Sequence, residues 1–438
     1  MAFNSLIFLI VFLPLFLLLF YVIPKKYKYL IVLFCSVIFY LYSGLFNFFL
    51  LIGICIFNYI ATRLLSRKNI SFLWYLLIIL NIIVLCLFKY GISSIFPLGI
   101  SFYTFNNISY IVDIKRKKID AEKNILYYMT YILLFCHITM GPLVRYNDLK
   151  ESIINPNIDY NDSLEGFRLF IWNLIKKVLI ADNLGMLYST LMSNSNSSSL
   201  LNIICLIVFG LQLYIDFSSY SNMVIGLGKM IGIKYPVNFD YPYLSLSISE
   251  FWRRWHISLS NFFKEYIYFP LGGNRVNTFR HIINIMIIWI ITGIWHGNTF
   301  NFIIWGLYYG IILLLEKYFF NKLLDKVPNF IKHIYVLLIV LIGYIFFSIN
   351  DINEIVLFTK SIFTSPFMNN IILFYLKENW LLLIISIILC FRLPSKLNDF
   401  INKPYIMFIC NILLIVLYIV SICYIVSGSY LPFLYNNF

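Results

Sequence analysis

Charged residues are scarce in this sequence: Asp, Glu, Lys and Arg make up 12% of its 438 residues, whereas hydrophobic residues make up 61%. A water-soluble domain carries roughly 25% charged residues. The composition therefore excludes a soluble globular protein. Apolar runs long enough to cross a hydrocarbon layer of about 30 Å recur along the whole chain, so we expect an all-α polytopic membrane protein surrounded by membrane lipids.

Cysteine pairs are also absent. The eight cysteines are scattered singly through apolar stretches, as Cys35, Cys86, Cys205 and Cys410 illustrate. None of them belongs to a Cys-x-x-Cys pair or has the spacing to a histidine that metal sites show. We interpret them as small hydrophobic residues and expect neither a bound metal nor a tightly bound cofactor.

Acidic residues are outnumbered by basic ones, which gives a net charge of +14. The basic residues lie in short clusters between apolar runs, as they do in the cytoplasmic loops of membrane proteins. The charge therefore indicates membrane topology, and we expect no nucleic acid partner. The clusters are Lys25, Lys26 and Lys28; Arg63, Arg67 and Lys68; residues 115–118; and Lys317, Lys322 and Lys326.

The apolar runs predict about 11 to 13 transmembrane or re-entrant helices in one membrane domain. Charge follows the first run instead of preceding it, so this run is expected to be an uncleaved span and not a signal peptide. Residues 229–280 contain no run long enough to cross. The predicted helices cover residues 5–23, 29–45, 46–62, 71–88, 97–112, 124–142, 165–183, 199–228, 281–295, 300–316, 331–349, 371–391 and 405–427.

The segment 247–275 is aromatic and basic. Ser247 and Glu250 have the spacing of a capping box, which predicts a helix that begins near residue 248. Aromatic residues recur at helical spacing up to Pro270, so one amphipathic helix at the membrane interface is expected. His256 falls on or beside its aromatic face. The alternative is that this helix only anchors the protein to the membrane and that His256 has a structural role.

A second histidine, His296, follows an apolar run of about fifteen residues, which reaches roughly 22 Å as a helix. We therefore expect it below the membrane surface, unless the helix begins earlier or the membrane is locally thinned. Ionisable groups at that depth often mark active sites. Imidazole suits acyl transfer to a hydroxyl, because its usual pKa of about 6.5 makes it an effective base. The alternative is a turn histidine bonded to a carbonyl.

Asp216 is a third candidate, in the stretch 211–223, which mixes an acid, hydroxyls and an amide within an apolar region. A polar packing network is one interpretation. The other is a residue that orients a histidine or lines a channel.

Six stretches in order across residues 100–310 resemble the membrane-bound O-acyltransferase family, and most of all its alginate O-acetyltransferase branch. The segment GGNR directly after YFPL and the segment RRWHISLS favour that branch. The stretches are GPLVRY (141–146), KKVLIADNL (176–184), LYIDFSSYSNMVIGLGKMIG (213–232), WRRWHISLS (252–260), YFPLGGNR (268–275) and GIWHG (293–297).

The resemblance implies helices in a ring around a central acyl channel, with N-terminal helices over 1–96, a catalytic core over 97–310 and C-terminal helices over 311–438. It implies that His296 activates the acceptor hydroxyl and that His256 supports the site or lies along the acyl path. Residues of the channel or its support are then Asp216, Trp255, Trp295 and Asn298. Contacts to the donor phosphates are our own hypothesis for Arg253, Arg254 and Arg275.

The implied function is transfer of an acetyl group from a cytosolic donor, acetyl-CoA, for O-acetylation of an extracytoplasmic polysaccharide. An exported partner of the SGNH-hydrolase type is implied, and the protein itself is expected in the bacterial cytoplasmic (inner) membrane. Transfer of D-alanyl or another acyl group from a carrier protein to a cell-wall polymer is an alternative. A transporter without covalent chemistry is a third interpretation.

Overall fold

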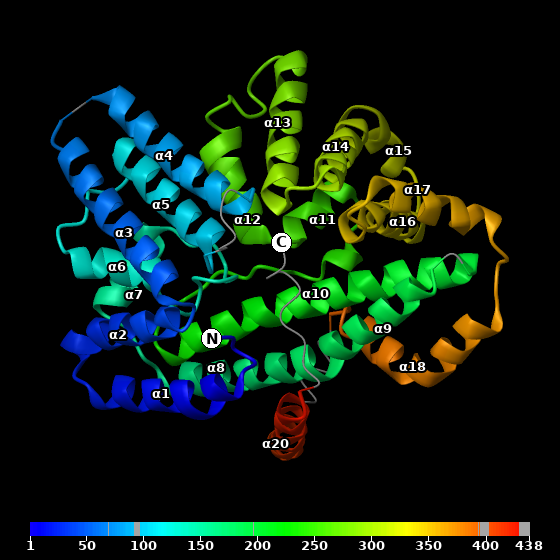
Figure 1. Ribbon diagram of the computed structural model, residues 1–438, viewed down its shortest axis with the longest axis horizontal. Helices are drawn as coiled ribbons and strands as arrows, with labels where there is room; N and C mark the ends of the chain where they lie inside the picture. The colour runs from blue at the N-terminus through cyan, green and yellow to red at the C-terminus, as the bar shows by residue number, and fades with distance from the viewer. Residues whose placement is uncertain (69, 92–96, 196, 393, 395–402, 429–438) are drawn as a thin grey trace. The chain divides into compact units, whose positions relative to one another are not determined.

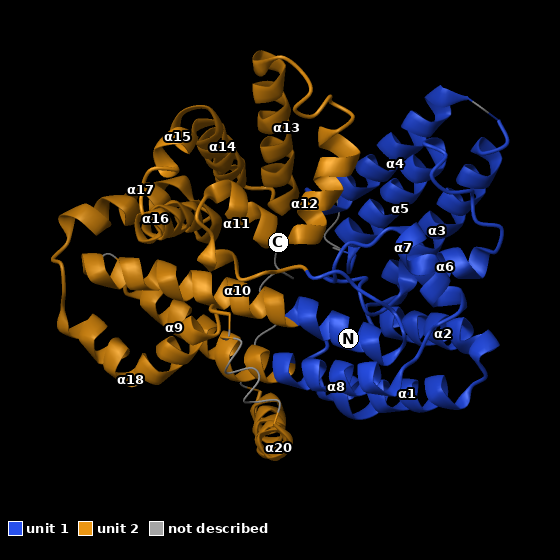
Figure 2. Cartoon of the chain, turned by 180° about the vertical axis from the view of Figure 1, so that it is seen from behind, with its two compact units in different colours: residues 1–173, 220–237 blue, residues 174–219, 238–438 orange. Residues whose placement is uncertain are grey.

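The computed structural model describes residues 1–438 except 69, 92–96, 196, 393, 395–402 and 429–438. All regular structure in the described residues is helical (Figure 1), which confirms the predicted all-α class. The chain divides into two compact units (Figure 2). Residues 1–173 and 220–237 form the first unit, and residues 174–219 and 238–438 form the second.

The first unit is built around a helix with almost no exposed side chain, α5 (Ile100–Lys115). Aromatic rings fill the space near the start of the chain, where Phe8, Phe12 and Phe39 lie in contact with Phe135. The other helices are η1 (Ile7–Phe12), α1 (Leu13–Val22), η2 (Lys25–Tyr27), α2 (Lys28–Leu41), α3 (Leu45–Leu65), α4 (Ser71–Lys89), α6 (Ile125–Leu133), α7 (Tyr146–Ile154) and most of α8 (Tyr160–Ile175).

The second unit holds both histidines of the sequence motifs. The helices of this unit that precede His256 are η3 (Lys176–Ala181), α9 (Asp182–Ser193), part of α10 (Ser199–Met230), η4 (Pro242–Leu244) and α11 (Ile248–Arg254). The remainder are α12 (Ile257–Phe263), η5 (Lys264–Tyr268), α13 (Thr278–His296), α14 (Phe300–Leu315), η6 (Glu316–Phe320), α15 (Asn321–Leu324), α16 (Asn329–Ser348), α17 (Ile352–Thr364), α18 (Asn370–Ile388) and α20 (Pro404–Val426).

Among the described residues, eight helices are long and apolar enough to cross a membrane, so the chain is a multi-pass membrane protein. The other predicted runs form shorter helices. The run expected over 124–142 is helical only to Leu133, because the backbone leaves the helical region at Leu134. The eight spans are Leu45–Leu65, Ser71–Lys89, Ser199–Met230, Thr278–His296, Phe300–Leu324, Asn329–Ser348, Asn370–Ile388 and Pro404–Val426.

Helices α13 and α14 form a closely packed hairpin. A Cβ on Gly293 would lie 2.3 Å from the backbone oxygen of Phe302, and one on Gly306 would lie 2.3 Å from that of Trp289. Only glycine permits so close an approach of two helix backbones. The hairpin fixes the end of α13, where His296 is the last helical residue.

Candidate active site

The predicted amphipathic helix begins where the sequence indicates and then breaks. Ser247 caps α11, and its Oγ accepts a hydrogen bond of 3.0 Å from the Glu250 backbone N–H. The prediction of one continuous helix is wrong. Trp255 is extended and His256 has φ +45°, so α11 ends at Arg254 and α12 begins at Ile257. Periodicity does not reveal this break, because the apolar residues keep their helical spacing on both sides of it.

Asn238 explains the break at His256. Its Oδ1 accepts hydrogen bonds from the Ser258 backbone N–H at 3.1 Å and from the Ser258 hydroxyl at 2.9 Å, and it lies 3.2 Å from His256 Nδ1. An amide oxygen only accepts, so Nδ1 carries the proton and Nε2 of the neutral ring is left basic. His256 lies outside the eight spans, and burial lowers its pKa to about 3.

His296 is enclosed by aromatic rings. Its ring centroid lies 4.8 Å from those of Trp295 and Trp305 and 5.1 Å from that of Phe347. Only 6% of the residue is exposed. The helix before it has 19 residues, about 28 Å, because its polar first turn precedes the apolar run. His296 therefore lies at the end of a helix long enough to cross a membrane, at the turn between α13 and α14.

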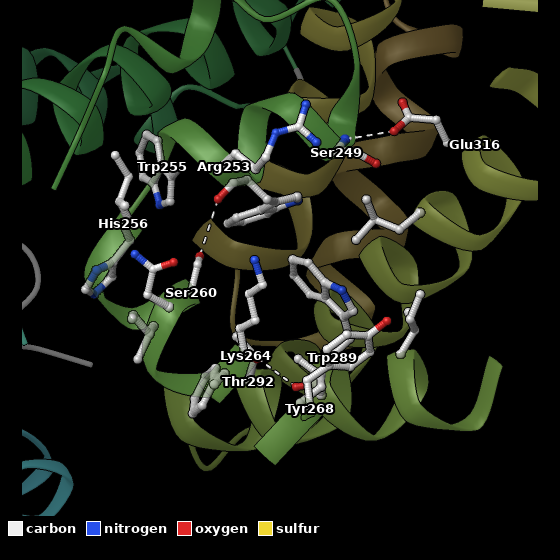
Figure 3. A pocket seen from close by; sticks show the side chains of 18 of the residues that line it. Ser249, Arg253, Trp255, His256, Ser260, Lys264, Tyr268, Trp289, Thr292 and Glu316 are labelled. Carbon is white, nitrogen blue, oxygen red and sulfur yellow. Dashed lines mark hydrogen bonds between the residues drawn. The ribbon is translucent and has the colours of Figure 1, made fainter. Parts of the chain in front are cut away.

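Both histidines line one cavity of about 710 Å³ within the second unit. Its lining residues come from α11, α12, η5, α13, α14, η6 and α15 and the turns beside them; Figure 3 shows most of these side chains. Trp295 touches both imidazoles, with its ring centroid 6.3 Å from that of His256. The cavity thus brings together two histidines that are forty residues apart in the sequence.

Of the other predicted site residues, some line this cavity and some do not. Trp255 and Arg253 line the cavity. Arg254 instead forms ion pairs with Glu250 at 2.8 Å and Asp240 at 3.7 Å.

Asn298 and Arg275 are exposed and are not among the residues that line the cavity.

Asp216 lies in a buried ion cluster. The Lys177 Nζ is 2.8 Å from Asp216 Oδ1 and 2.5 Å from Asp182 Oδ1, and each of the three side chains is at most 3% exposed. Lys177 and Asp182 come from the stretch KKVLIADNL. This geometry matches the polar packing network that is one of the two interpretations of Asp216 given above. It also gives the lysine and the aspartate of the stretch KKVLIADNL a shared structural role.

A third histidine also belongs to this site, and sequence reasoning missed it. His281, near the start of α13, is 3% exposed and contacts two cavity-lining residues, Lys317 and Tyr268. Nothing in the local sequence marks His281, because its partners lie 13 and 36 residues away. His281 therefore lies behind the cavity wall, near the end of α13 opposite His296.

The lining suits acyl transfer to a hydroxyl group. A neutral imidazole accepts a proton from a hydroxyl, and a site shielded from water strengthens electrostatic stabilisation of the developing charge. The lining combines aromatic and apolar side chains with three basic residues, Arg253, Lys264 and Lys317, and the acidic Glu316. A mostly apolar cavity with a few polar groups is the usual form of a site for a small ligand.

Comparison with known proteins agrees with this chemistry. The sequence model of the membrane-bound O-acyltransferase family matches residues 115–353. The chain is 35% identical over 378 residues to a probable alginate O-acetylase, AlgI, of Pseudomonas aeruginosa, which covers 80% of this chain and 73% of the relative. It is 32% identical to a peptidoglycan O-acetyltransferase of Helicobacter pylori, over 72% of this chain and 70% of the relative.

A more distant relative, the teichoic acid D-alanyltransferase of Streptococcus thermophilus, is 27% identical over 60% of this chain and 68% of its own length. All three relatives are named for acyl transfer to a polymer. The family match covers more than half of the chain and includes both motif histidines. The chain belongs to the membrane-bound O-acyltransferase family and is an O-acyltransferase.

Proposed function

We propose that this O-acyltransferase moves an acetyl group from cytosolic acetyl-CoA across the bacterial cytoplasmic membrane for O-acetylation of an extracytoplasmic polysaccharide. The observation that carries the proposal is the shared cavity, which His256 and His296 both line. The identity to alginate and peptidoglycan O-acetyltransferases supports acetyl as the group and a polysaccharide as the acceptor.

His296 is the proposed base. Its imidazole takes the proton as the acceptor O–H bond breaks, and the acceptor oxygen forms a bond to the acetyl carbonyl carbon. The carbon–sulfur bond of the thioester then breaks, and the leaving thiolate takes the proton from the imidazolium. A positioned base of this kind contributes about 10²- to 10⁴-fold to the rate. The aromatic rings around His296 exclude water, which would otherwise hydrolyse the thioester.

His256 is the second proposed site residue. Asn238 fixes its tautomer, so its Nε2 is an acceptor. Burial depresses the pKa of His256, which keeps it neutral at physiological pH. A neutral acceptor in the same cavity supports the base role of His296 without adding positive charge beside it.

The proposed acceptor lies outside the cytoplasm, and an exported SGNH-hydrolase-type protein is the proposed recipient of the acetyl group before the polysaccharide. Acyl transfer from a carrier protein, as the name of the D-alanyltransferase relative suggests, is the second candidate. The higher identity to the two O-acetyltransferases favours acetyl transfer.

Mass spectrometry of surface polymers tests the proposal. A strain that lacks the gene is compared with its parent and with the strain carrying the gene on a plasmid. We expect O-acetyl groups on a surface polysaccharide to disappear and to return with the plasmid, while D-alanyl esters stay unchanged. Loss of D-alanyl esters with retained O-acetyl groups contradicts acetyl transfer.

Deletion of genes for SGNH-hydrolase-type exported proteins in the same strain tests the partner. If the partner receives the acetyl group, its deletion removes the same O-acetyl groups as deletion of the acyltransferase. Full acetylation in a strain without any such protein shows that no partner of this type is needed.

A further inference from the structure

A second cavity lies within the second unit, apart from the one that His256 and His296 line. It has a volume of about 250 Å³, and its lining residues come from α10, η4, α16, the last turn of α18 and the residues just after α18. The two cavities have no lining residue in common. Except for Tyr243, Tyr344 and Cys390, the second cavity is lined only by glycine, aliphatic residues and phenylalanine.

The polar groups of this second cavity are already paired within the protein. The Tyr243 hydroxyl donates a hydrogen bond of 2.6 Å to the backbone oxygen of Gly210, and the hydroxyl oxygens of Tyr243 and Tyr344 lie 2.6 Å apart. Because a hydroxyl has a single hydrogen, Tyr344 is the donor to Tyr243. The Cys390 thiol donates to the Ser386 backbone oxygen at 3.3 Å. The lining side chains therefore keep no hydrogen for a polar ligand, and the cavity suits an apolar one.

The second cavity has a buried floor and an exposed rim. On its floor, Val340 of α16 and Leu211 of α10 are 2% and 6% exposed. On its rim, Leu337 of α16 and Ile387 of α18 are 41% and 45% exposed. Both α16 and α18 are long and apolar enough to cross a bilayer, so the medium that meets this rim is lipid and not water.

The size of the second cavity indicates which apolar group fills it. An apolar cavity of about 150 Å³ stays dry and binds benzene. An empty cavity forfeits the dispersion contacts of its walls, so an apolar molecule that can enter is stabilised there. One turn of a helix about 10 Å wide occupies roughly 400 Å³, which is too large for a transmembrane helix of another protein to enter. An acyl chain is narrow enough, and it is the most abundant apolar group at the rim.

The floor of the second cavity contacts the aromatic rings that enclose His296. The ring centroid of Tyr344 lies 5.5 Å from that of Phe209, and the centroid of Phe209 lies 6.4 Å from that of Phe347. Phe347 in turn lies 5.1 Å from His296. A chain bound in the second cavity therefore packs against Tyr344, on the side of this aromatic layer that faces away from His296.

We infer that the second cavity binds one acyl chain of a bilayer phospholipid. The chain enters between Leu337 and Ile387 and covers Val340 and Leu211, while the glycerol and the head group stay outside. The site is separate from the proposed acetyl transfer in place and in chemistry, because it holds a hydrocarbon and leaves it unchanged. A ligand that binds only the folded protein stabilises it by mass action, so this lipid is expected to stabilise the second unit.

Photo-crosslinking of the purified full-length chain in lipid nanodiscs tests the inference. The probe is phosphatidylglycerol with a diazirine near the end of one acyl chain, and mass spectrometry of peptides gives the crosslink yield at each residue. Val336 and Val340 are matched valines one turn apart on α16. Both are at most 2% exposed, and only Val340 lines the cavity. We expect a yield at Val340 at least fivefold that at Val336, and equal yields overturn the inference.

Two tryptophan variants test the route by which the probe reaches Val340. Leu341→Trp fills the cavity, whereas Ile342→Trp is the matched control, because Ile342 does not line it. We expect the Val340 yield to fall at least fivefold in Leu341→Trp and to stay at the wild-type value in Ile342→Trp. An unchanged yield in Leu341→Trp overturns the inference. If Leu341→Trp does not fold, the wild-type ratio of the two valine yields decides the inference by itself.

Two further measurements identify the occupant and its effect. A diazirine fatty acid that crosslinks to Val340 where the phosphatidylglycerol probe does not overturns a phospholipid as the source of the chain. In detergent solution, we expect added phosphatidylglycerol to raise the thermal midpoint of the wild type more than that of Leu341→Trp. Equal rises overturn the stabilising role, because the lipid that stabilises the protein then binds elsewhere.

Discussion

His256 Nδ1 lies 3.2 Å from Oδ1 of Asn238, an oxygen that also accepts two hydrogen bonds from Ser258. Asn238 is fully buried, so this one amide oxygen serves three donors without competition from water. It stabilises the break between α11 and α12 and sets the histidine tautomer at the same time. The local fold and the chemistry of His256 therefore depend on one side chain.

Asn238→Leu tests this dependence. The change removes the acceptor and leaves the Ser258 N–H unsatisfied, which costs about 1–3 kcal/mol of unfolding free energy. We expect acetyl transfer at saturating donor to fall at least tenfold, because the tautomer of His256 is no longer fixed. Asn353→Leu on the exposed start of α17 is the control. Asn238 has no functional role if the variant transfers acetyl groups at the wild-type rate.

The depressed pKa of His256 predicts a pH effect on stability. Burial lowers this pKa to about 3, whereas the unfolded ring has a pKa near 6.5. Below pH 6.5 the unfolded chain binds a proton that the folded chain does not, so stability is lost as pH falls from about 6.5 towards 3. The slope from this one group is at most about 1.4 kcal/mol per pH unit.

Thermal unfolding of the wild type and of His256→Gln between pH 7.5 and 4.5 measures this contribution. We expect the midpoint of the wild type to fall more steeply below pH 6.5 than that of the variant. Parallel curves show that His256 titrates normally in the folded protein. His137 is also buried and has its pKa lowered to about 4; it is present in both proteins, so its contribution cancels in the comparison.

The Lys177 cluster predicts a stability defect separate from catalysis. Lys177→Met leaves Asp182 and Asp216 buried without their cation, at a cost of about 3–5 kcal/mol. We expect little folded protein in the membrane, measured by fluorescence-detected gel filtration. Lys229→Met is the control: it breaks the partly exposed pair with Glu165 and costs about 0–1 kcal/mol. Equal yields of the two variants contradict a structural role for the cluster.

The α13–α14 hairpin predicts that a single methyl group disturbs the site. In Gly293→Ala the new Cβ meets the Phe302 backbone oxygen at 2.3 Å, so the helices separate and His296 moves. We expect about 1–3 kcal/mol of destabilisation and reduced acetyl transfer. Gly53→Ala in α3 has nothing within 4 Å of its Cβ and is the control. A Gly293→Ala protein with the activity of Gly53→Ala shows that the hairpin tolerates separation.

Local signals in the sequence predicted the features that local interactions determine. The capping residues Ser247 and Glu250 located the start of α11, because the bond between them closes within four residues. The break at His256 was not predictable, since it depends on Asn238, eighteen residues upstream. His281 was missed for the same reason. Hydropathy located the long spans, but it does not distinguish a lipid-facing helix from one buried inside the protein, such as α5.

The rate of acetyl transfer by His296→Ala tests the central claim, that this imidazole is the base within the cavity. Purified wild type, His296→Ala and His333→Ala are compared with radiolabelled acetyl-CoA and membranes that contain the acceptor. His333 lies in α16 and does not line the cavity, so its variant controls for loss of a histidine. We predict a rate at least 100-fold lower for His296→Ala at an equal amount of folded protein. Wild-type transfer by His296→Ala contradicts the account.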